Sequence, residues 1–334
     1  MSDVAKIVSD IKNGKIHPIY FLMGEEPYYI DKISEYIEKN ILQEEEKGFN
    51  QMVLYGRDVA IEDIIDNAKR FPMMSERQVV IVKEAQSLSR TIDKLASYAQ
   101  NIQPSTVLVI CYKYKKLDKR KAVYKAIQKV GLVYESKKLY ENQVADWVRR
   151  VVSGKNYKID SKAALMLVEF LGNDLSRISN ELDKLMVVLP ENATITPQDI
   201  EQNIGISKDY NNFELRKAVG ERNVLKVNKI INYFGHNQKS NPIVLTISLL
   251  NSFFTQLLIY HSLNDKSKNN VAIALGVHPF FVADYSTAAN NYPMRKVSQV
   301  IALLRETDVK SKGVGANATP EGQLLKELLF KILH

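Results

Sequence analysis

The chain has 334 residues, of which 45% are hydrophobic and 25% charged, with a formal net charge of +8 and a single cysteine. This composition is typical of an ordinary water-soluble protein of two or three domains, and it excludes a disulfide-stapled fold, because Cys111 alone cannot form an internal disulfide and fits a reducing cytosol. The positive charge permits an anionic partner such as nucleic acid but does not require one, and residues 1–15 lack the apolar core of a signal peptide.

The first part of the chain alternates short apolar runs with helical patterns. We expect helices at 4–11, 28–42, 61–71, 91–100 and 118–129, and strands at 19–23, 52–55, 79–82, 106–111 and 132–134. This alternation predicts an α/β domain with a mostly parallel sheet. The run from Val79 to Val82 contains four β-branched residues and no polar alternation, which is typical of a strand buried on both faces.

The connection into the strand at 79–82 carries three large apolar side chains. Pro72 disfavours the helical conformation at Phe71, so the preceding helix should end about there. Phe71, Met73 and Met74 then lie on a tight surface connection, where they could form a wedge for a hydrophobic pocket on another protein. Local pattern alone favours the alternative, in which they pack back against their own domain.

A strand, a glycine and a helix follow one another around Gly24, where a phosphate-binding loop would lie. Such a loop needs G-x-x-x-x-G-K-[ST], but counting from Gly24 its last three positions are the Tyr-Ile-Asp of residues 29–31. Glu25 and Glu26 would also repel a phosphate, and Lys83 stands where a magnesium-holding aspartate would be expected. We therefore expect neither a nucleotide nor another cofactor to be bound.

A basic segment spans residues 112–129 and has tyrosines interleaved. Its cations are Lys113, Lys115, Lys116, Lys119, Arg120, Lys121, Lys125 and Lys129, against Asp118 as its acidic residue. The favoured interpretation is a solvated helix face, since charge runs are usually that. The alternative is salt-sensitive contact with a DNA backbone through Lys113, Lys115, Lys116, Lys119 and Arg120.

The strands stop at about residue 140. Helical patterns follow at 141–153, 160–171 and 174–189, with Asp160 and Asp174 placed as N-caps, and a fourth helix opens at 196–199. We expect three domains: an α/β domain at 1–139, a small helical bundle at 140–208 and an all-helical domain at 209–334. Within the last, residues 242–260 are long enough and apolar enough for a membrane span, but Ser, Asn, Thr and Gln recur along one face, which favours a bundle helix.

The sequence contains few residue patterns that would indicate catalysis or metal binding. The five histidines, His17, His236, His261, His278 and His334, have no ligand-like spacing, and no H-E-x-x-H, C-x-x-C or G-x-S-x-G motif occurs. The sequence therefore favours a binding protein over an enzyme, with no metal site.

Six segments carry a resemblance to a known family. They are YFLMGEEPYYID at 20–31, PMMSERQVVIV at 72–82, DLSRISNELDKL at 174–185, FELRKA at 213–218, LGVHPFF at 275–281 and GQLLKELLFKIL at 322–333. In this order they resemble the delta subunit of the bacterial DNA polymerase III clamp loader over nearly the whole chain. The C-terminal tail and the segment KSKGVG at 310–315 look most like the Bacteroidetes form.

The resemblance implies an AAA+-like first domain with a degenerate nucleotide site, a small lid-like domain and a helical collar that joins a five-membered ring. It implies no catalysis by this chain itself, which would be a subunit of a DNA-directed DNA polymerase. Ser176 falls where active relatives carry a nucleotide-sensing arginine, with Arg177 beside it. The family's clamp-opening wedge falls on Phe71, Met73 and Met74, where two methionines replace the more usual leucine and phenylalanine.

The implied partners are the sliding clamp (the beta ring), the ATPase subunits tau/gamma, delta-prime and primed DNA, in the cytoplasm and away from membranes. Two other functions remain open at this point. One is an active ATPase of the same fold, which the absent G-K-[ST] disfavours. The other is a basic nucleic-acid-binding adaptor without a clamp partner, which would bind DNA in a salt-dependent manner.

Overall fold

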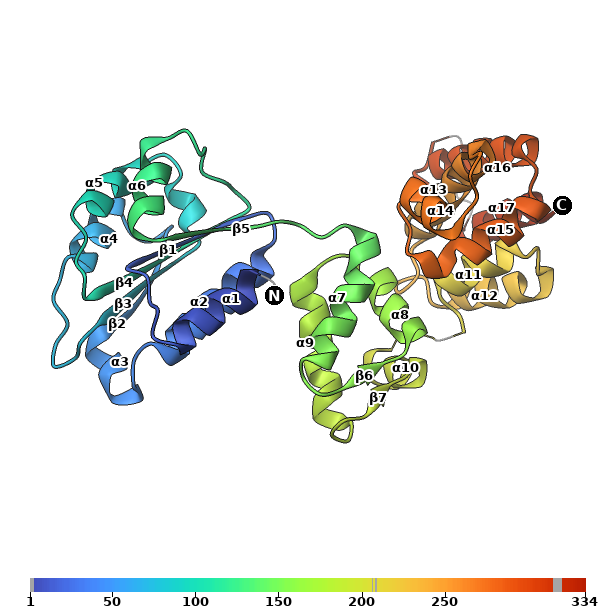
Figure 1. Cartoon of the computed structure of the whole chain (residues 1–334). Coiled ribbons are helices and arrows are strands. Elements are labelled where there is room, and N and C mark those ends of the chain that lie inside the picture. The colour runs from blue at the N-terminus through green and yellow to red at the C-terminus, as the bar shows by residue number, and fades with distance from the viewer. Residues whose placement is uncertain (1–2, 206, 208, 315–319) are drawn as a thin grey trace. The chain divides into compact units, whose positions relative to one another are not determined.

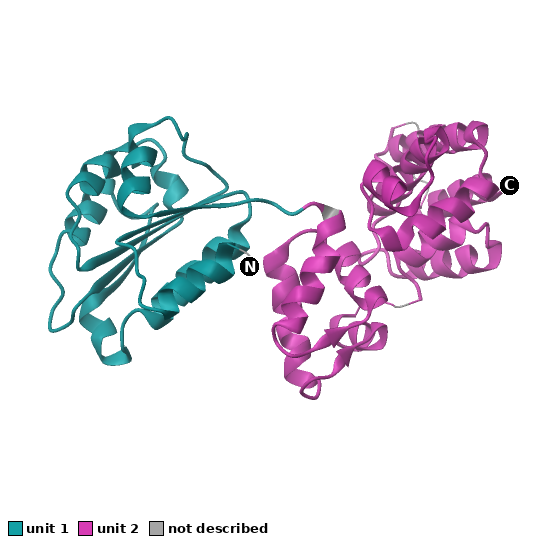
Figure 2. Cartoon of the chain, viewed as in Figure 1, with its two compact units in different colours: residues 1–139 teal, residues 140–334 magenta. Residues whose placement is uncertain are grey.

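The computed structural model describes residues 3–205, 207, 209–314 and 320–334. It divides into two compact units, residues 1–139 and residues 140–334 (Figure 2). Each unit is described separately below.

The first unit is built on a five-stranded sheet. Its strands are β1 (Ile19–Gly24), β2 (Gln51–Tyr55), β3 (Gln78–Lys83), β4 (Thr106–Lys113) and β5 (Leu132–Ser136). They lie in the order β2-β3-β4-β1-β5, and every neighbouring pair is parallel, which confirms the α/β prediction. Parallel order brings the carboxyl ends of all five strands to one edge, where ligands bind in folds of this type.

Helices cover both faces of this sheet (Figure 1). They are α1 (Asp3–Lys12), α2 (Pro27–Asn40), α3 (Glu44–Asn50), α4 (Ile61–Ala68), η1 (Ala85–Leu88), η2 (Ile92–Lys94), α5 (Leu95–Gln100) and α6 (Ala122–Val130). Val79 and Ile81 pack in the apolar cluster beneath α1 and α2, whereas Val80 and Val82 pack in the opposite cluster with α4 to α6. The strand is therefore buried on both faces, as its four β-branched residues predict.

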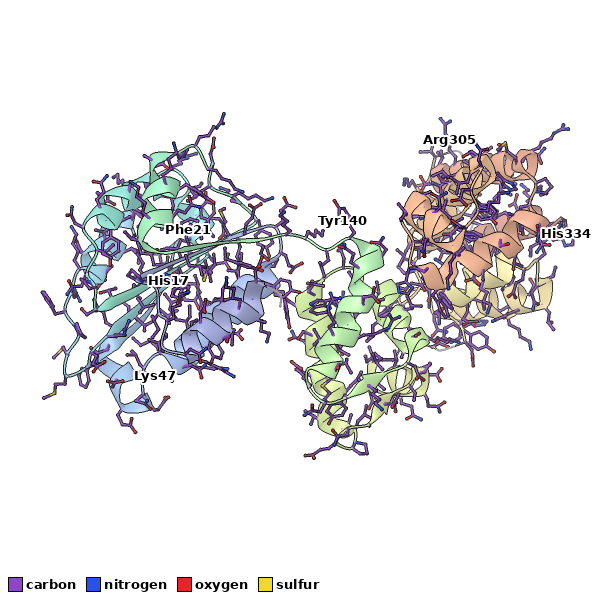
Figure 3. The ribbon with its side chains drawn as sticks, viewed as in Figure 1. His17, Phe21, Lys47, Tyr140, Arg305 and His334 are labelled. Carbon is purple, nitrogen blue, oxygen red and sulfur yellow. The ribbon has the colours of Figure 1, made fainter. Side chains whose placement is uncertain are left out.

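Two residues of the central strands illustrate how completely these clusters are buried. Phe21 of β1, labelled in Figure 3, is fully buried in the cluster of α4 to α6. Cys111 of β4 is fully buried in the other cluster, and this burial raises the pKa of its thiol to about 12. The single thiol is thus structural rather than reactive.

Two helix boundaries in this unit differ from the sequence-based expectation by three or more residues, and one α-helix was not expected. The helix predicted at 61–71 ends at Ala68, and the helix predicted at 118–129 begins only at Ala122. The second difference has a local cause: the Asp118 carboxylate accepts hydrogen bonds from the backbone N–H and the guanidinium of Arg120, which holds a turn instead of a helix. The short helix α3 was not predicted at all.

The second unit begins at the exposed Tyr140 (Figure 3) and is mostly helical. Its first part contains α7 (Glu141–Ser153), α8 (Ser161–Leu171), α9 (Leu175–Val188) and α10 (Pro197–Ile204). Asp174 caps α9 by accepting a hydrogen bond from the Arg177 N–H at 3.0 Å, whereas Asp160 occupies the N-cap position of α8 without a side-chain cap hydrogen bond. The expectation of helices alone is wrong here, because β6 (Lys158–Ile159) and β7 (Thr194–Ile195) pair as a short parallel ladder.

The rest of the unit is a helical assembly around one apolar core. Its elements are α11 (Asn212–Gly220), α12 (Val224–His236), α13 (Ile243–Ser262), α14 (Lys268–Leu275), η3 (Pro279–Phe281), α15 (Val282–Asn291), α16 (Met294–Ser311) and α17 (Glu321–Leu333). The expected boundary at 208/209 and the last residue of the 310–315 segment lie on or beside residues outside the described part of the chain.

Helix α13 is the long apolar stretch of the sequence. Among the described residues it is the one helix long and apolar enough by composition to cross a membrane, apart from the sharply bent pair formed by α14 and η3–α15. Its apolar face is buried in the core at helical spacing, as at Ile247, Leu250 and Phe254, while Ser248 and Asn251 of its polar stripe face solvent. This is the pattern of a bundle helix.

Candidate functional site

The connection between α4 and β3 projects three large apolar side chains into solvent. Phe71 is 78% exposed, Met73 is 62% exposed and Met74 is completely exposed. The alternative in which these side chains pack back against their own domain is therefore wrong. Exposed clusters of this kind mark surfaces that contact another protein.

Helix α4 ends early because side chains from other elements donate hydrogen bonds to its last carbonyl groups. The Ala68 carbonyl accepts hydrogen bonds from the Thr106 hydroxyl at 2.8 Å and the Tyr98 hydroxyl at 3.3 Å. The Gln78 side-chain amide donates to the carbonyls of Asn67 and Arg70. These donors satisfy groups that would otherwise lack partners at a helix end, so the chain leaves the helix before Pro72 acts.

A residue that the sequence analysis did not single out holds the next part of this connection. Asn50, at the end of α3, donates to the Met73 carbonyl at 2.9 Å and accepts from the Met73 N–H at 2.7 Å. The next residue, Met74, has a φ of 53° in the left-handed region. The Glu-rich first turn of α3 at 44–46 was the one available signal for this helix, and nothing in the sequence indicated the 23-residue link from Asn50 to Met73.

A second candidate site lies at the carboxyl end of β1, where a phosphate loop would stand. The backbone N–H groups of Glu25 and Glu26 donate to the Ser136 carbonyl at 3.0 and 3.4 Å, and that of Gly24 donates to the Lys115 carbonyl at 3.0 Å. A Cβ on Gly24, whose φ is +130°, would lie 2.0 Å from the Ser136 oxygen. The glycine is thus required by the close approach of β5, and the amides that would bind a phosphate already have acceptors.

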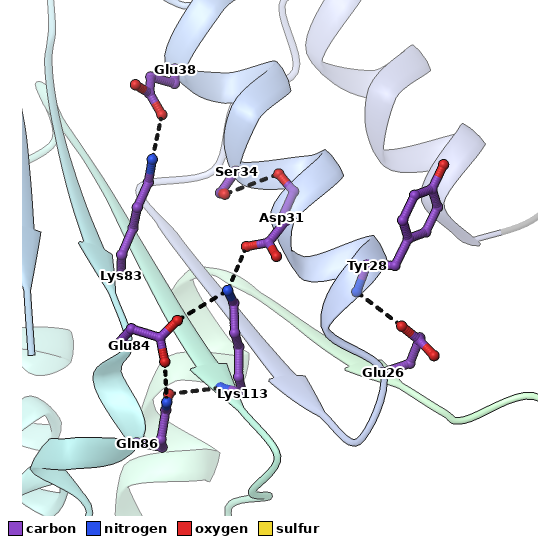
Figure 4. A network of polar contacts seen from close by, with 9 residues as sticks. All are labelled: Glu26, Tyr28, Asp31, Ser34, Glu38, Lys83, Glu84, Gln86 and Lys113. Carbon is purple, nitrogen blue, oxygen red and sulfur yellow. Dashed lines mark hydrogen bonds and ion pairs between the residues drawn. The ribbon is translucent and has the colours of Figure 1, made fainter. Parts of the chain in front are cut away.

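Charged side chains fill the adjoining strand ends (Figure 4). Lys113 Nζ lies 2.8 Å from Asp31 Oδ1 and 3.1 Å from Glu84 Oε1, and Lys83 Nζ lies 3.2 Å from Glu38 Oε2. The side chain of Lys113 is only 14% exposed.

The electrostatics of this network favour its ionised form. Burial lowers the pKa of Lys113, but its hydrogen bonds and the charges of Asp31 and Glu84 outweigh burial, so its pKa lies above the ordinary value. Burial raises the pKa of Glu84, but hydrogen bonds from Gln86 and Lys113 outweigh it and hold that pKa below the ordinary value. The strand ends therefore carry a self-contained ion cluster.

The basic segment is largely neutralised by neighbouring carboxylates. Lys116 lies 3.0 Å from Glu25 and 3.2 Å from Glu135, and Lys119 lies 3.3 Å from Glu135. Arg120 pairs with Asp118 at 2.7 Å.

The remaining two cations proposed for DNA contact also have partners. Lys113 belongs to the ion cluster, and Lys115 donates to the Ser89 hydroxyl at 2.9 Å. Each of the five side chains therefore has a partner within the chain, so they do not form a continuous free cationic face.

Metal chemistry finds no support in the described part of the chain. No group of three or more His, Cys, Asp or Glu side chains there could hold a metal ion. Each of the five histidines has a neighbour in the fold: His17 contacts Tyr20, His236 contacts the Asn232 carbonyl, and His334 contacts Phe330. His261 contacts the Tyr292 carbonyl at 2.8 Å and His278 lies 3.5 Å from Asp146.

Two family models match this chain. Residues 20–137 match the model described as DNA polymerase III, delta subunit, and residues 209–330 match DNA polymerase III delta subunit, C-terminal domain. The DNA polymerase III subunit delta of Bacillus subtilis is 28% identical over 98% of this chain and 96% of its own length. The solved structure of the Bacillus subtilis DNA clamp loader delta protein superposes with a TM-score of 0.58 at 25% identity, covering 99% of both chains.

Proposed function

Because the chain belongs to the family of DNA polymerase III delta subunits, we propose that it binds and opens the ring-shaped sliding clamp for loading onto primed DNA. It does so without hydrolysing ATP itself. The observation that carries this proposal is the exposure of Phe71, Met73 and Met74 together on one connection of an AAA+-like domain.

The mechanism is mechanical. The three side chains, hereafter the wedge, insert into a hydrophobic pocket of the clamp near a subunit junction. Each large apolar side chain that becomes fully buried contributes about 1.5–3 kcal/mol, so the wedge could supply several kcal/mol. That energy shifts a closed ring towards an open one only to the extent that the open ring binds the wedge better.

The remaining parts of the clamp loader supply the control. ATP-binding subunits of the tau/gamma type and a delta-prime subunit complete the ring of subunits and set when the wedge is presented. The helices from about 213 to 333 form the collar that joins them. Exposed apolar side chains on α13, such as Val244 and Leu245, suit such a contact. The complex works in the cytoplasm, where primed DNA is found.

Two other functions were open from the sequence. An active ATPase of the same fold is disfavoured because the loop amides after β1 already donate to backbone carbonyls and because Lys113 joins the strand ends to Asp31. A basic DNA-binding adaptor is disfavoured because Lys116, Lys119 and Arg120 of its expected DNA-binding segment are paired with carboxylates.

The test is capture of the cognate sliding clamp by the full chain and by the triple variant Phe71→Ala/Met73→Ala/Met74→Ala. We expect wild type to capture the clamp and the triple variant to lose most of it. Val187→Ala/Val188→Ala is a matched control, since both valines are exposed apolar residues of α9 in the other unit. Equal capture by wild type and the triple variant would remove the wedge from the mechanism.

A further inference from the structure

The side chain of Asn50 makes an unusual contact with the main chain of the wedge. It is 5% exposed, and its amide satisfies both the N–H and the C=O of Met73, at 2.7 and 2.9 Å. Its Nδ2 also donates to the Glu46 carbonyl at 3.2 Å, which ties the contact to the last turn of α3. One buried side chain thus makes the two main-chain hydrogen bonds that a neighbouring β-strand would otherwise make with Met73.

The wedge has few other constraints. Its three side chains are exposed, so packing does not hold them. Met74 adopts a φ of 53°, a conformation that residues with a Cβ seldom adopt and that persists only where the surroundings impose it. On one side, the Gln78 side-chain amide donates to the Arg70 carbonyl. On the other, the Ser75 hydroxyl accepts from the Arg77 N–H and contacts the Glu46 carboxylate of α3. Asn50 holds the residue between them, Met73.

We propose that Asn50 is a positioning residue that fixes the wedge in its docking conformation before the clamp arrives. This inference rests on the proposed function. A segment that is ordered only at binding loses conformational entropy at that moment, whereas one fixed in advance does not. The free protein therefore presents Phe71, Met73 and Met74 preformed, and Asn50 contributes to clamp affinity without touching the clamp.

The chemistry of the contact explains why an asparagine is used. A main-chain N–H and C=O of one residue need an acceptor and a donor held side by side, and a carboxamide supplies both. Asn50→Asp would keep the acceptor for the Met73 N–H but would set a carboxylate against the Met73 carbonyl. Asn50→Ala would remove both hydrogen bonds.

The experiment compares wild type, Asn50→Ala, Asn50→Asp and a matched control, Asn40→Ala, as full chains. Asn40 also donates its side-chain amide to the carbonyl four residues before it, at 2.8 Å, but it is exposed at the end of α2. The readouts are the Kd for the cognate clamp, amide hydrogen exchange over residues 71–76, and the thermal unfolding midpoint.

We expect Asn50→Ala to bind the clamp roughly tenfold more weakly, the factor expected when the backbone of about one residue must be ordered at binding. Exchange at residues 71–76 should rise in the same variant. In both the Kd and the exchange rate at residues 71–76, Asn50→Asp should lie between Asn50→Ala and wild type. Asn40→Ala should match wild type in these two quantities. A purely structural role would lower the unfolding midpoint without this local rise in exchange.

The outcomes separate this inference from the proposed function. If wild type binds the clamp and the triple alanine variant does not, clamp binding through the wedge holds, and wild-type affinity in a folded Asn50→Ala overturns the role of Asn50. If Asn50→Ala does not fold, Asn50→Asp decides: weaker binding with faster local exchange supports the proposal, and wild-type binding overturns it. If wild type itself does not bind, the proposed function fails.

Discussion

Lys113 and Asp31 form an ion pair, with Nζ 2.8 Å from Oδ1, at the edge of the sheet where a nucleotide phosphate and its magnesium would bind in an active relative of this fold. Asp31 occupies the position of the phosphate loop's Ser/Thr, counted from Gly24. The pair joins α2 to β4 and is continued by Glu84 (Figure 4). Side chains of the chain itself thus occupy these strand ends and link α2 to the sheet.

This arrangement predicts that the chain does not bind ATP. The backbone amides after β1 are engaged with the Ser136 and Lys115 carbonyls, and no lysine stands at the phosphate-loop position. Equilibrium titration with Mg-ATP, followed by calorimetry, should give no saturable heat, with an active clamp-loader ATPase as the positive control. Saturable binding at physiological ATP concentrations would restore the ATPase hypothesis.

The ion cluster should stabilise the first unit. Lys113→Ala would leave Asp31 and Glu84 without their shared partner at a site where the lysine is mostly buried. We expect the free energy of unfolding to fall by about 1–3 kcal/mol, between the ranges for surface and buried pairs. Native-state hydrogen exchange of the β1 and β4 amides would measure it. Lys119→Ala, which removes a more exposed ion pair, should have a much smaller effect.

The same cluster should make stability depend on pH. Since the pKa of Glu84 is held below its ordinary value, its contribution is present above the unfolded-state pKa of about 4.3 and is lost as pH falls through the folded-state pKa. Since the pKa of Lys113 is raised, its contribution is lost only as pH rises through that raised value. The stability difference between wild type and Lys113→Ala should therefore be largest near neutral pH and shrink in acid. A difference that does not change with pH would contradict this assignment.

The basic segment should contribute little to DNA binding by the isolated chain. Lys119 and Arg120 are each paired with a carboxylate, so releasing them for phosphate contact would cost an existing interaction. Lys119→Gln/Arg120→Gln should leave both the affinity for primed DNA and its salt dependence near those of wild type. A decrease of about two in the slope of log K against log salt would show instead that both side chains contact phosphates.

The ion pairs of Glu214 should make the stability of the second unit sensitive to acid. The Glu214 side chain is 7% exposed and pairs with Lys162 of α8 at 2.8 Å and with Lys226 of α12. Burial raises the pKa of Glu214, but hydrogen bonds from the two lysines outweigh burial and lower it, so its contribution is lost as pH falls through the lowered value.

Glu214→Gln should lower the free energy of unfolding by about 1–3 kcal/mol at neutral pH. Trp147 is the only tryptophan and is buried in α7 of the same unit, so its fluorescence reports this transition during urea unfolding. Glu327→Gln, in an exposed i,i+4 pair of α17, is the control and should leave the transition in place. A midpoint equal to wild type for Glu214→Gln would show that the lysines are solvated equally well without it.

The features that sequence analysis predicted are those with a local cause. The run from Val79 to Val82 predicted a doubly buried strand because four β-branched residues leave no solvated face. The polar stripe of residues 242–260 likewise indicated which face of α13 meets water.

The features it missed depend on partners distant in sequence. Helix α4 ends before Pro72 because Tyr98, Thr106 and Gln78 supply donors to its last turn. Lys113 was counted as part of a free basic segment because its partner Asp31 lies 82 positions earlier in the chain. Asn50 gave no signal, since an asparagine at the end of a short helix has many ordinary explanations.

The seclusion of Cys111 leaves this protein without a reactive surface thiol. A cysteine introduced at Met74 would therefore be the sole target for a maleimide dye, attached at the outermost point of the corner. The change in the dye's emission wavelength on leaving water would then report the rates of docking and release of this connection in an assembled clamp loader. No other change to the chain would be needed.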